Sequence, residues 1–205
     1  MKVIDLFAGC GGLALGFKNE GFKTVAFLEW EKSCIETLYE NFGKSRNQKS
    51  FIQADIREFD TFINGNEYQL EKTIDASGGI DGVIGGPPCQ GFSIAARGKK
   101  SSIKDDNTNF IDDPRNQLFK YFLEFVEYYN PKIVLIENVK GLITAHGYLP
   151  SMIKSLEETG LGYESDYTLI DCSKFGIPQK RERVFIVGIR KDQLDSKEFI
   201  LNFNK

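Results

Sequence analysis

A cysteine that follows two prolines is the residue best suited to chemistry in this sequence. Cys89 stands in the run Gly-Gly-Pro-Pro-Cys-Gln-Gly-Phe-Ser at residues 85–93. The prolines fix the backbone just before the thiol, and we expect a strand on one side of it and a loop on the other. A nucleophilic cysteine needs such a rigid, partly exposed position near positive charge, which lowers the thiol pKa. A turn that happens to contain a cysteine is the plainer alternative.

An acid and two arginines are candidates for the same reaction. Glu137 begins the segment Glu-Asn-Val, which follows the apolar run 133–136. A carboxylate at a strand end beside a cleft can hydrogen-bond a ring nitrogen and an amino group together, and a dry site would raise its pKa enough to share a proton. Arg181 and Arg183 belong to Gln-Lys-Arg-Glu-Arg, and the period of two of a strand places both on one face. A surface acid and a solvated strand edge are the alternatives here.

A glycine-rich loop predicts a site for an adenosine-type ligand. Residues 5–12, Asp-Leu-Phe-Ala-Gly-Cys-Gly-Gly, join an expected strand to an expected helix, where glycines allow positive φ and the helix N-terminus favours anionic groups. Glu29 ends the next expected strand, and an acid at that place typically holds ribose hydroxyls. Trp30 offers a flat face to adenine, and Asp55 can reach the adenine amino group. Taken alone, the glycine pattern also fits a dinucleotide site or a tight turn.

Alternating strands and helices must position these residues. The sequence predicts strands at residues 3–7, 24–28, 50–53, 82–84, 132–136, 163–170 and 183–190, with helices at 13–19, 32–41, within 59–79, after Pro114 and at 149–159. This order is typical of an α/β fold with a mostly parallel, twisted sheet covered by helices on both faces. The last two strands lack a long crossover, so we expect an antiparallel pair. Ligands of such sheets bind beyond the carboxyl ends of the strands, where all the candidate residues fall.

The composition is that of an ordinary globular protein in a reducing compartment. The chain has 205 residues, 41% apolar and 27% charged, and a net charge of -3. No apolar run approaches the roughly 20 residues of a membrane span, and the first residues resemble a strand rather than a signal peptide. One histidine and four cysteines without a Cys-x-x-Cys spacing predict no metal site. Because the net charge is negative, any surface that binds nucleic acid must be a local cluster of positive charge.

In this order and at these spacings, the motifs resemble the DNA cytosine-5 methyltransferase family. The matching stretches are residues 5–12, 85–93, 112–119, 137–139 and 179–183. The resemblance covers nearly the whole chain. It implies a Rossmann-like, S-adenosylmethionine-dependent methyltransferase fold over residues 1–205, acting in a restriction-modification system in the cytoplasm of a prokaryote or encoded by a phage.

The resemblance also implies a role for each residue. The Cys89 thiolate adds to C6 of a cytosine flipped out of the duplex, Glu137 binds the N3 and amino edge, and C5 takes the methyl group of S-adenosylmethionine. Loss of the C5 proton and expulsion of Cys89 restore the ring, while Arg183 and Arg181 hold the base O2 and offset nearby negative charge. The implied cofactor residues are Phe7, Ala8, Gly9, Cys10, Gly11, Gly12, Glu29, Trp30, Asp55, Ile56, Pro88 and Leu118. The implied substrate contacts are Gln90, Ser93, Asn138, Val139 and Gln179.

The chain departs from the family pattern after Arg183. The family continues into a target-recognition domain and has later Arg-x-Leu-Thr and Gly-Asn-x-Val segments, none of which occur before Lys205. We therefore expect an incomplete catalytic domain that acts on duplex DNA by itself or with a second polypeptide carrying the target-recognition domain. The other hypotheses are a non-catalytic fragment, methylation of RNA and a nicotinamide-dependent oxidoreductase. The last of these leaves Pro-Pro-Cys-Gln without a role.

Overall fold

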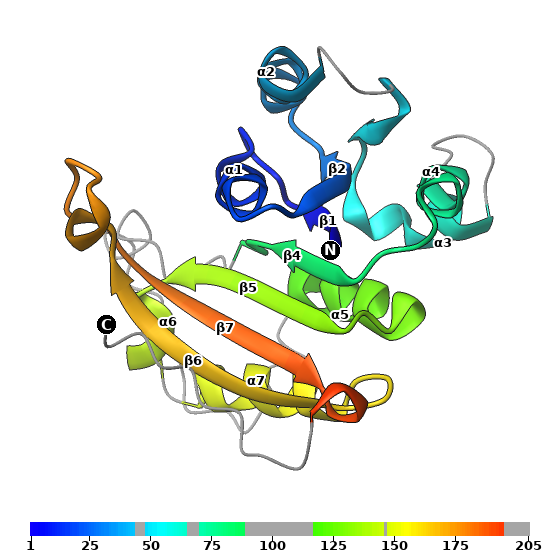
Figure 1. Cartoon of the computed structure of the whole chain (residues 1–205). Helices are drawn as coiled ribbons and strands as arrows, with labels where there is room; N and C mark the ends of the chain where they lie inside the picture. Colours follow the sequence, from blue (N-terminus) through cyan, green and yellow to red (C-terminus); the bar gives the residue numbers. More distant parts are fainter. Residues whose placement is uncertain (44–47, 65–69, 89–116, 146, 195–205) are drawn as a thin grey trace.

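A seven-stranded sheet forms the centre of the protein, seen in a computed structural model that describes residues 1–43, 48–64, 70–88, 117–145 and 147–194 (Figure 1). The strand order is β3-β2-β1-β4-β5-β7-β6. The strands are β1 Lys2–Leu6, β2 Lys23–Glu29, β3 Phe51–Gln53, β4 Gly82–Gly85, β5 Ile133–Val139, β6 Tyr163–Asp171 and β7 Glu182–Arg190. The first five strands pair in parallel, whereas β7 pairs antiparallel with both β5 and β6. The predicted fold class, including the terminal antiparallel pair, is confirmed.

Helices lie on both sides of this sheet. They are α1 Gly12–Asn19, α2 Lys32–Phe42, α3 Phe59–Asn64, α4 Leu70–Ser77, α5 Gln117–Tyr129, α6 Gly141–Thr144 and α7 Tyr148–Glu158. Figure 1 shows α1 and α2 on one side and α5 and α7 on the other. Two short helices occupy the region 59–79 where one was expected, and α6 was not predicted. Pro114 lies outside the described residues, but the helix expected after it is present as α5.

The period of two along β2 explains why both faces need helices. Phe27 packs with Ala14 of α1 and Leu38 of α2, whereas its neighbours Ala26 and Leu28 belong to the larger core on the opposite face. A strand buried on both faces has no polar side, which is the pattern of a parallel strand inside an α/β sheet. The apolar sequence of β2 therefore requires the two helical layers.

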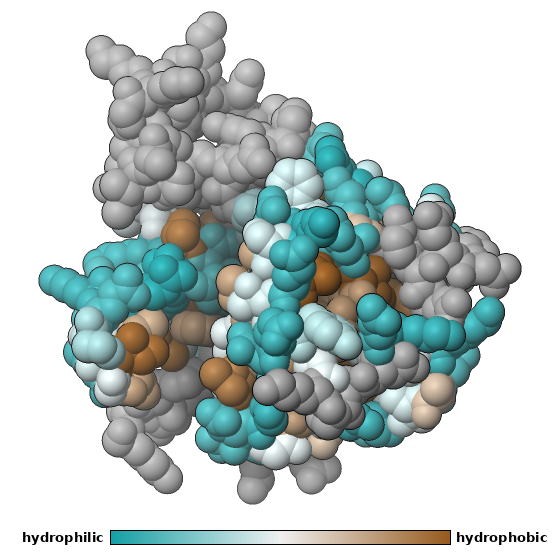
Figure 2. All heavy atoms as spheres, turned by 90° about the horizontal axis from the view of Figure 1, so that it is seen from above, coloured by the Kyte–Doolittle hydropathy of each residue, from teal (hydrophilic) through white to brown (hydrophobic). Residues whose placement is uncertain are grey.

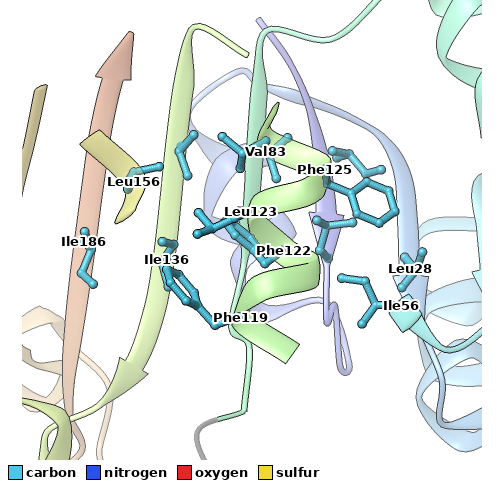
Figure 3. Packing of buried hydrophobic residues seen from close by; sticks show 14 of the residues in the cluster. Leu28, Ile56, Val83, Phe119, Phe122, Leu123, Phe125, Ile136, Leu156 and Ile186 are labelled. Carbon is cyan, nitrogen blue, oxygen red and sulfur yellow. The ribbon is translucent and has the colours of Figure 1, made fainter. Parts of the chain in front are cut away.

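The larger core is built on α5. Phe119, Phe122 and Val126 recur at helical spacing and are all buried, as the sequence predicts for one face of an amphipathic helix. Figure 3 shows the phenylalanines of α5 packed toward Ile136 of β5 and Leu28 of β2, with Ile56 beside them. This packing fixes the start of α5 against the carboxyl ends of the central strands, where the candidate residues lie.

One face of the antiparallel half of the sheet is less completely covered. Along β7, the buried Val184 and Ile186 alternate with the half-buried Phe185 and Val187. The same alternation runs along the neighbouring β5, and α7 contacts β6 and β7. Seen from above, apolar surface is visible in several separate places between polar residues (Figure 2). This half of the sheet therefore keeps one apolar face partly accessible.

The close approach of three elements at the end of β4 gives a stability prediction. Gly85 pairs with Leu6 and Ile136, and a β-carbon on it would collide with the Leu6 carbonyl oxygen and lie 3.1 Å from Cε2 of Phe122. We expect Gly85→Ala to lower the free energy of unfolding by ~1–3 kcal/mol, the usual cost of overpacking. Urea denaturation measures this change.

Gly16 is the matched control. It lies inside α1, and a β-carbon on it would meet no atom within 4 Å. Gly16→Ala should stabilise the protein by ~0.4–1 kcal/mol, since alanine restricts the unfolded chain. Equal effects of the two substitutions would contradict the packing at Gly85.

Candidate active site

A cleft lies at the carboxyl ends of the parallel strands. Its volume is about 280 Å³, near the lower bound of small-molecule sites and suited to a nucleoside-sized group. Its walls come from the last residues of β2, from segments that follow strands and from the start of α5. The lining residues are Phe7, Leu28, Glu29, Trp30, Ala54, Asp55, Ile56, Arg57, Pro88, Gln117 and Leu118. Seven residues of the predicted cofactor set therefore line one cleft.

The glycine loop, which begins beside this cleft at Phe7, has unusual backbone conformations. Phe7, Gly9 and Gly11 all have positive φ, at 59°, 52° and 88°. A β-carbon on Gly11 would lie 2.6 Å from Cε2 of Phe42, so glycine is required there by packing as well as by φ. Positive φ at a bulky residue such as Phe7 costs energy and is concentrated at functional sites. The loop itself, which includes Ala8, Cys10 and Gly12, was predicted but does not line the cleft beyond Phe7.

Glu29 holds the glycine loop in place. Its carboxylate accepts hydrogen bonds from the backbone N–H of Gly9 at 2.8 Å, of Trp30 at 2.9 Å and of Glu31 at 3.0 Å. The residue is only 8% exposed. A carboxylate has about four acceptor positions, so these three bonds leave capacity for one donor from a ligand. Glu29 therefore shapes the cleft, and its predicted contact with ribose stays a prediction.

Two further predicted residues stand at the rim. Trp30 is 68% exposed beside the cleft, so its ring is open to a planar ligand. The Asp55 carboxylate accepts from the backbone N–H of Arg57 at 3.0 Å and from its Nε at 2.9 Å and 3.0 Å. These bonds to Arg57 lower the pKa of Asp55. Arg57 was missed, although an acid followed two residues later by arginine just after a strand was a usable signal.

A second cluster lies on β5, next to the end of β4. The Glu137 carboxylate forms an ion pair with Nε of Arg183 at 2.9 Å, and Nη2 of Arg181 lies 4.0 Å away. The prediction that both arginines share one face is confirmed. A β-carbon on Gly86 would lie 3.2 Å from Oε2 of Glu137, so the missing side chain lets the carboxylate approach the backbone that leads to Pro87.

Asn138 attaches the two-proline segment to the sheet. Its Nδ2 donates to the Pro87 carbonyl at 3.1 Å, and its Oδ1 accepts from the Val139 N–H at 2.8 Å. Glu137, Asn138 and Val139 lie within β5 rather than after it, because β7 continues to pair with them. Asn138 is only 4% exposed, so its side chain positions the segment before Cys89. Its predicted substrate contact is untested, as is that of Val139.

Of the remaining predicted substrate and catalytic residues, Gln179 is the one that the structure describes. Gln179 is exposed, and its backbone N–H donates to the Ile177 carbonyl at 2.7 Å. Cys89, Gln90 and Ser93 lie outside the described residues. Within the part of the chain that is described, no group of three or more acidic, histidine or cysteine side chains is arranged to hold a metal ion.

Asp5 is a buried acid that the sequence reasoning did not place in the site. It lies on β1 just before the glycine loop and is fully buried. Burial raises its pKa to about 8, the Ala14 amide opposes this, and the charge of Glu29 adds to it. The Asp5 carboxyl group is therefore mostly protonated at neutral pH. A single acid inside an apolar strand was the available signal.

The fold and the cleft define a class of protein: a Rossmann-like α/β domain with a nucleoside-sized cleft beyond its parallel strands and a carboxylate held by arginines beside it. The chain belongs to the C-5 cytosine-specific DNA methylase family, whose model matches residues 1–205. No helix among the described residues is both long and apolar enough to cross a membrane.

Several bacterial proteins are similar to this chain. The type II methyltransferase M.NgoPII of Neisseria gonorrhoeae is 36% identical over 196 residues, which cover 94% of this chain and 49% of the relative. M.AquIA of Picosynechococcus sp. is 36% identical over 197 residues, covering 92% of this chain and 72% of the relative. A solved structure described as a prophage-encoded DNA modification methyltransferase of E. coli has a TM-score of 0.66 at 31% identity, covering 96% of this chain and 49% of that one. The chain thus spans about half the length of the first of these relatives.

The buried acid on β1 gives a pH-dependent prediction. The pKa of Asp5 rises from an ordinary 3.8 to about 8 on folding. Between these two pH values the carboxyl group is ionised in the unfolded chain but protonated in the folded protein. The stability that Asp5 contributes is therefore lost as the pH rises from about 4 to about 8. Asp5→Asn removes this ionisation. We expect the free energy of unfolding of Asp5→Asn, measured by urea denaturation, to increase relative to that of wild type as the pH rises across this interval. If the free energies of both proteins changed with pH in parallel, Asp5 would be ionised in the folded protein.

Proposed function

We propose that this protein transfers a methyl group from S-adenosylmethionine to C5 of cytosine in duplex DNA. The observation that carries the proposal is the Glu137 carboxylate, held 2.9 Å from Arg183 and beside the segment that leads through Pro87 and Pro88 to Cys89. Pro88 also lines the nucleoside-sized cleft. The proposed binding sites for the reacting edge of a base and for the methyl donor are therefore adjacent. Membership of the family supports this chemistry.

The cleft fits S-adenosylmethionine, which supplies an electrophilic methyl group when bound. Trp30 is open for stacking on adenine, Asp55 is held ionised by Arg57 at the same rim, and Glu29 retains one acceptor position for ribose. The glycine loop ends at the N-terminus of α1, which favours the carboxylate of the amino-acid portion. These residues would bind and orient the donor.

The protein's own groups then act on the base. The Cys89 thiolate forms a bond to C6, which makes C5 nucleophilic, while Glu137 hydrogen-bonds N3 and the exocyclic amino group. Arg183 and Arg181 hold the base O2 and balance the negative charge of Glu137 and the thiolate. C5 takes the methyl group, and S-adenosylhomocysteine is left as the product. Water accepts the C5 proton, and the electrons of that C–H bond expel the Cys89 thiolate and restore the aromatic ring. A base stacked in a duplex is inaccessible to such an attack, so the cytosine is flipped out.

A second candidate is that activity requires a partner polypeptide. The half-buried apolar residues of β5 and β7 support it, because a sheet face of this kind is normally covered. The partner would carry the residues that read the DNA sequence. In either case we place the protein in the prokaryotic cytoplasm, in a restriction-modification system like those that the names of its type II relatives indicate.

A nucleoside assay tests the proposed reaction. Incubation with S-adenosylmethionine and unmodified duplex DNA, followed by digestion and mass spectrometry, should yield 5-methylcytosine. A parallel incubation with transfer RNA tests the RNA alternative.

Cys89→Ser should bind S-adenosylmethionine like wild type and lose methyl transfer, and Glu137→Gln should slow transfer by about 10²–10⁴-fold, the usual contribution of a proton-transfer group. Methyl transfer by Cys89→Ser would exclude Cys89 as the nucleophile.

The exposed indole gives a separate test of the cofactor site. Trp30→Ala should weaken S-adenosylmethionine binding by roughly 1–3 kcal/mol, the range measured for base–aromatic stacking. Titration calorimetry measures the affinity. Tyr39→Ala is the matched control, because that aromatic residue is exposed on α2 but does not line the cleft. Equal affinities of the Trp30→Ala variant and wild type would exclude the stacking role.

A further inference from the structure

The connection between β6 and β7 contains a run of exposed residues, 173–181, which we call the β6–β7 tip. Its sequence is Ser-Lys-Phe-Gly-Ile-Pro-Gln-Lys-Arg, with three basic residues and no acid, so the tip has a net charge of +3. The chain as a whole has a net charge of -3. The tip is therefore the kind of local positive cluster that an acidic protein needs in order to bind nucleic acid.

The acids on both sides of the tip are engaged within the fold. The Asp171 carboxylate accepts hydrogen bonds from the backbone N–H of Ser173 at 3.1 Å and from its hydroxyl at 2.9 Å, and these bonds lower the pKa of Asp171. Glu182 forms an ion pair with Lys140 at 2.8 Å. With Glu182 balanced by Lys140, the positive charge of the tip exceeds the negative charge beside it.

Backbone contacts give the tip a defined conformation. The Cys172 N–H donates to the Arg181 carbonyl at 2.9 Å, which closes the base of the loop. A 3₁₀ turn at Cys172–Phe175 then ends at Gly176, whose φ of 82° is left-handed. The side chains of the tip are presented from an ordered loop, which lowers the entropy that binding costs.

Two large apolar side chains of the tip are open to solvent. Phe175 is 62% exposed and Ile177 is 47% exposed. Apolar side chains among cations match DNA, where cations bind phosphates and apolar groups pack against bases that have lost their stacking. A protein-binding surface is normally depleted of lysine, so the composition of the tip favours DNA as the partner.

The tip lies at the edge of the sheet where the candidate site is. Strands β5 and β6 both pair antiparallel with β7, so β6 ends at the same edge as the parallel strands. Figure 1 shows the connection beyond this edge, in orange. Its last residue, Arg181, has Nη2 4.0 Å from the Glu137 carboxylate. Lys180 is thus one residue away from a side chain of the proposed base site.

We propose that the β6–β7 tip binds the DNA backbone beside the flipped cytosine. The inference rests on the proposed function, because it takes duplex DNA as the substrate. A flipped base stays bonded to its sugar and to the phosphates on either side, so cations next to the base site meet those phosphates. Lys174 and Lys180 bind phosphate oxygens and position the duplex without reading its sequence. Phe175 packs against the base pair that flipping leaves unstacked.

The salt dependence of DNA affinity tests the two lysines. The probe is a fluorescein-labelled duplex with unmodified cytosines, titrated with the whole chain between about 50 and about 200 mM salt. Each phosphate contact contributes about 0.9 to the slope of log affinity against log salt concentration. Lys174→Ala/Lys180→Ala should therefore weaken binding and reduce the magnitude of this slope by about 1.8. Its affinity for S-adenosylmethionine should equal that of wild type.

Lys23→Ala/Lys191→Ala is the matched control, because it removes the same charge at the opposite edge of the sheet. Lys23 begins β2 and Lys191 follows the end of β7, and both are exposed. This variant should keep the salt slope of wild type. Phe175→Ala should weaken DNA binding by about tenfold, within the range for an aromatic side chain against a base. Its salt slope should not change, because an apolar contact releases no counterions.

Three results would overturn the proposal: no binding of the duplex at low salt, a wild-type salt slope in the Lys174→Ala/Lys180→Ala variant, or equal losses in both double-lysine variants. A tip that binds a protein instead would leave DNA affinity unchanged in the lysine and Phe175→Ala variants. Failure of the proposed function looks different. In that case the tip substitutions weaken DNA binding as expected, but the wild-type chain forms no 5-methylcytosine in the nucleoside assay.

Discussion

The carboxylate of Glu29 is the contact on which the arrangement of the cleft depends. It accepts N–H donors from the loop after β1 and from the segment that enters α2, so one side chain ties together two stretches separated by about twenty residues. A buried carboxylate is costly unless such donors surround it. Phe7 and Gly9 have left-handed backbone conformations, which cost free energy. The hydrogen bond from the Gly9 amide to the Glu29 carboxylate offsets part of that cost. The cleft is thus preformed.

The antiparallel pairing of β5 with β7 has a corresponding role at the other side of the site. It carries Arg183 to the level of Val139, from where its side chain reaches Glu137. Asn138, one residue further, binds the Pro87 carbonyl and so joins this pair to the end of β4. The two groups of residues, each with its own supporting contacts, are therefore adjacent at Pro87 and Pro88, and Pro88 lines the nucleoside-sized cleft.

Local patterns in the sequence predict most of the helices and strands, but they do not predict contacts that depend on turns or on pairing between distant strands. The strands were predicted to within a few residues, because buried parallel strands and amphipathic helices have distinct apolar periods. The end of β5 was placed too early, since Glu137 and Asn138 are polar and only pairing with β7 keeps them in a strand. Arg57 was missed because its bonds to Asp55 depend on a turn, which has no period.

The position of β7 between β5 and β6 also bears on how the protein is made. Within the described sheet, β6 pairs with β7 and not with β5, so it has no place until the later strand has been synthesised. Pairings between distant segments form slowly, and a growing chain therefore holds Glu137 without its arginine until Arg183 has been synthesised. The half of the protein that lines the cleft is formed from the first 60 residues or so together with β4 and α5, and it can assemble earlier. Nascent chains should thus form the nucleoside-sized cleft before Glu137 acquires its ion pair with Arg183.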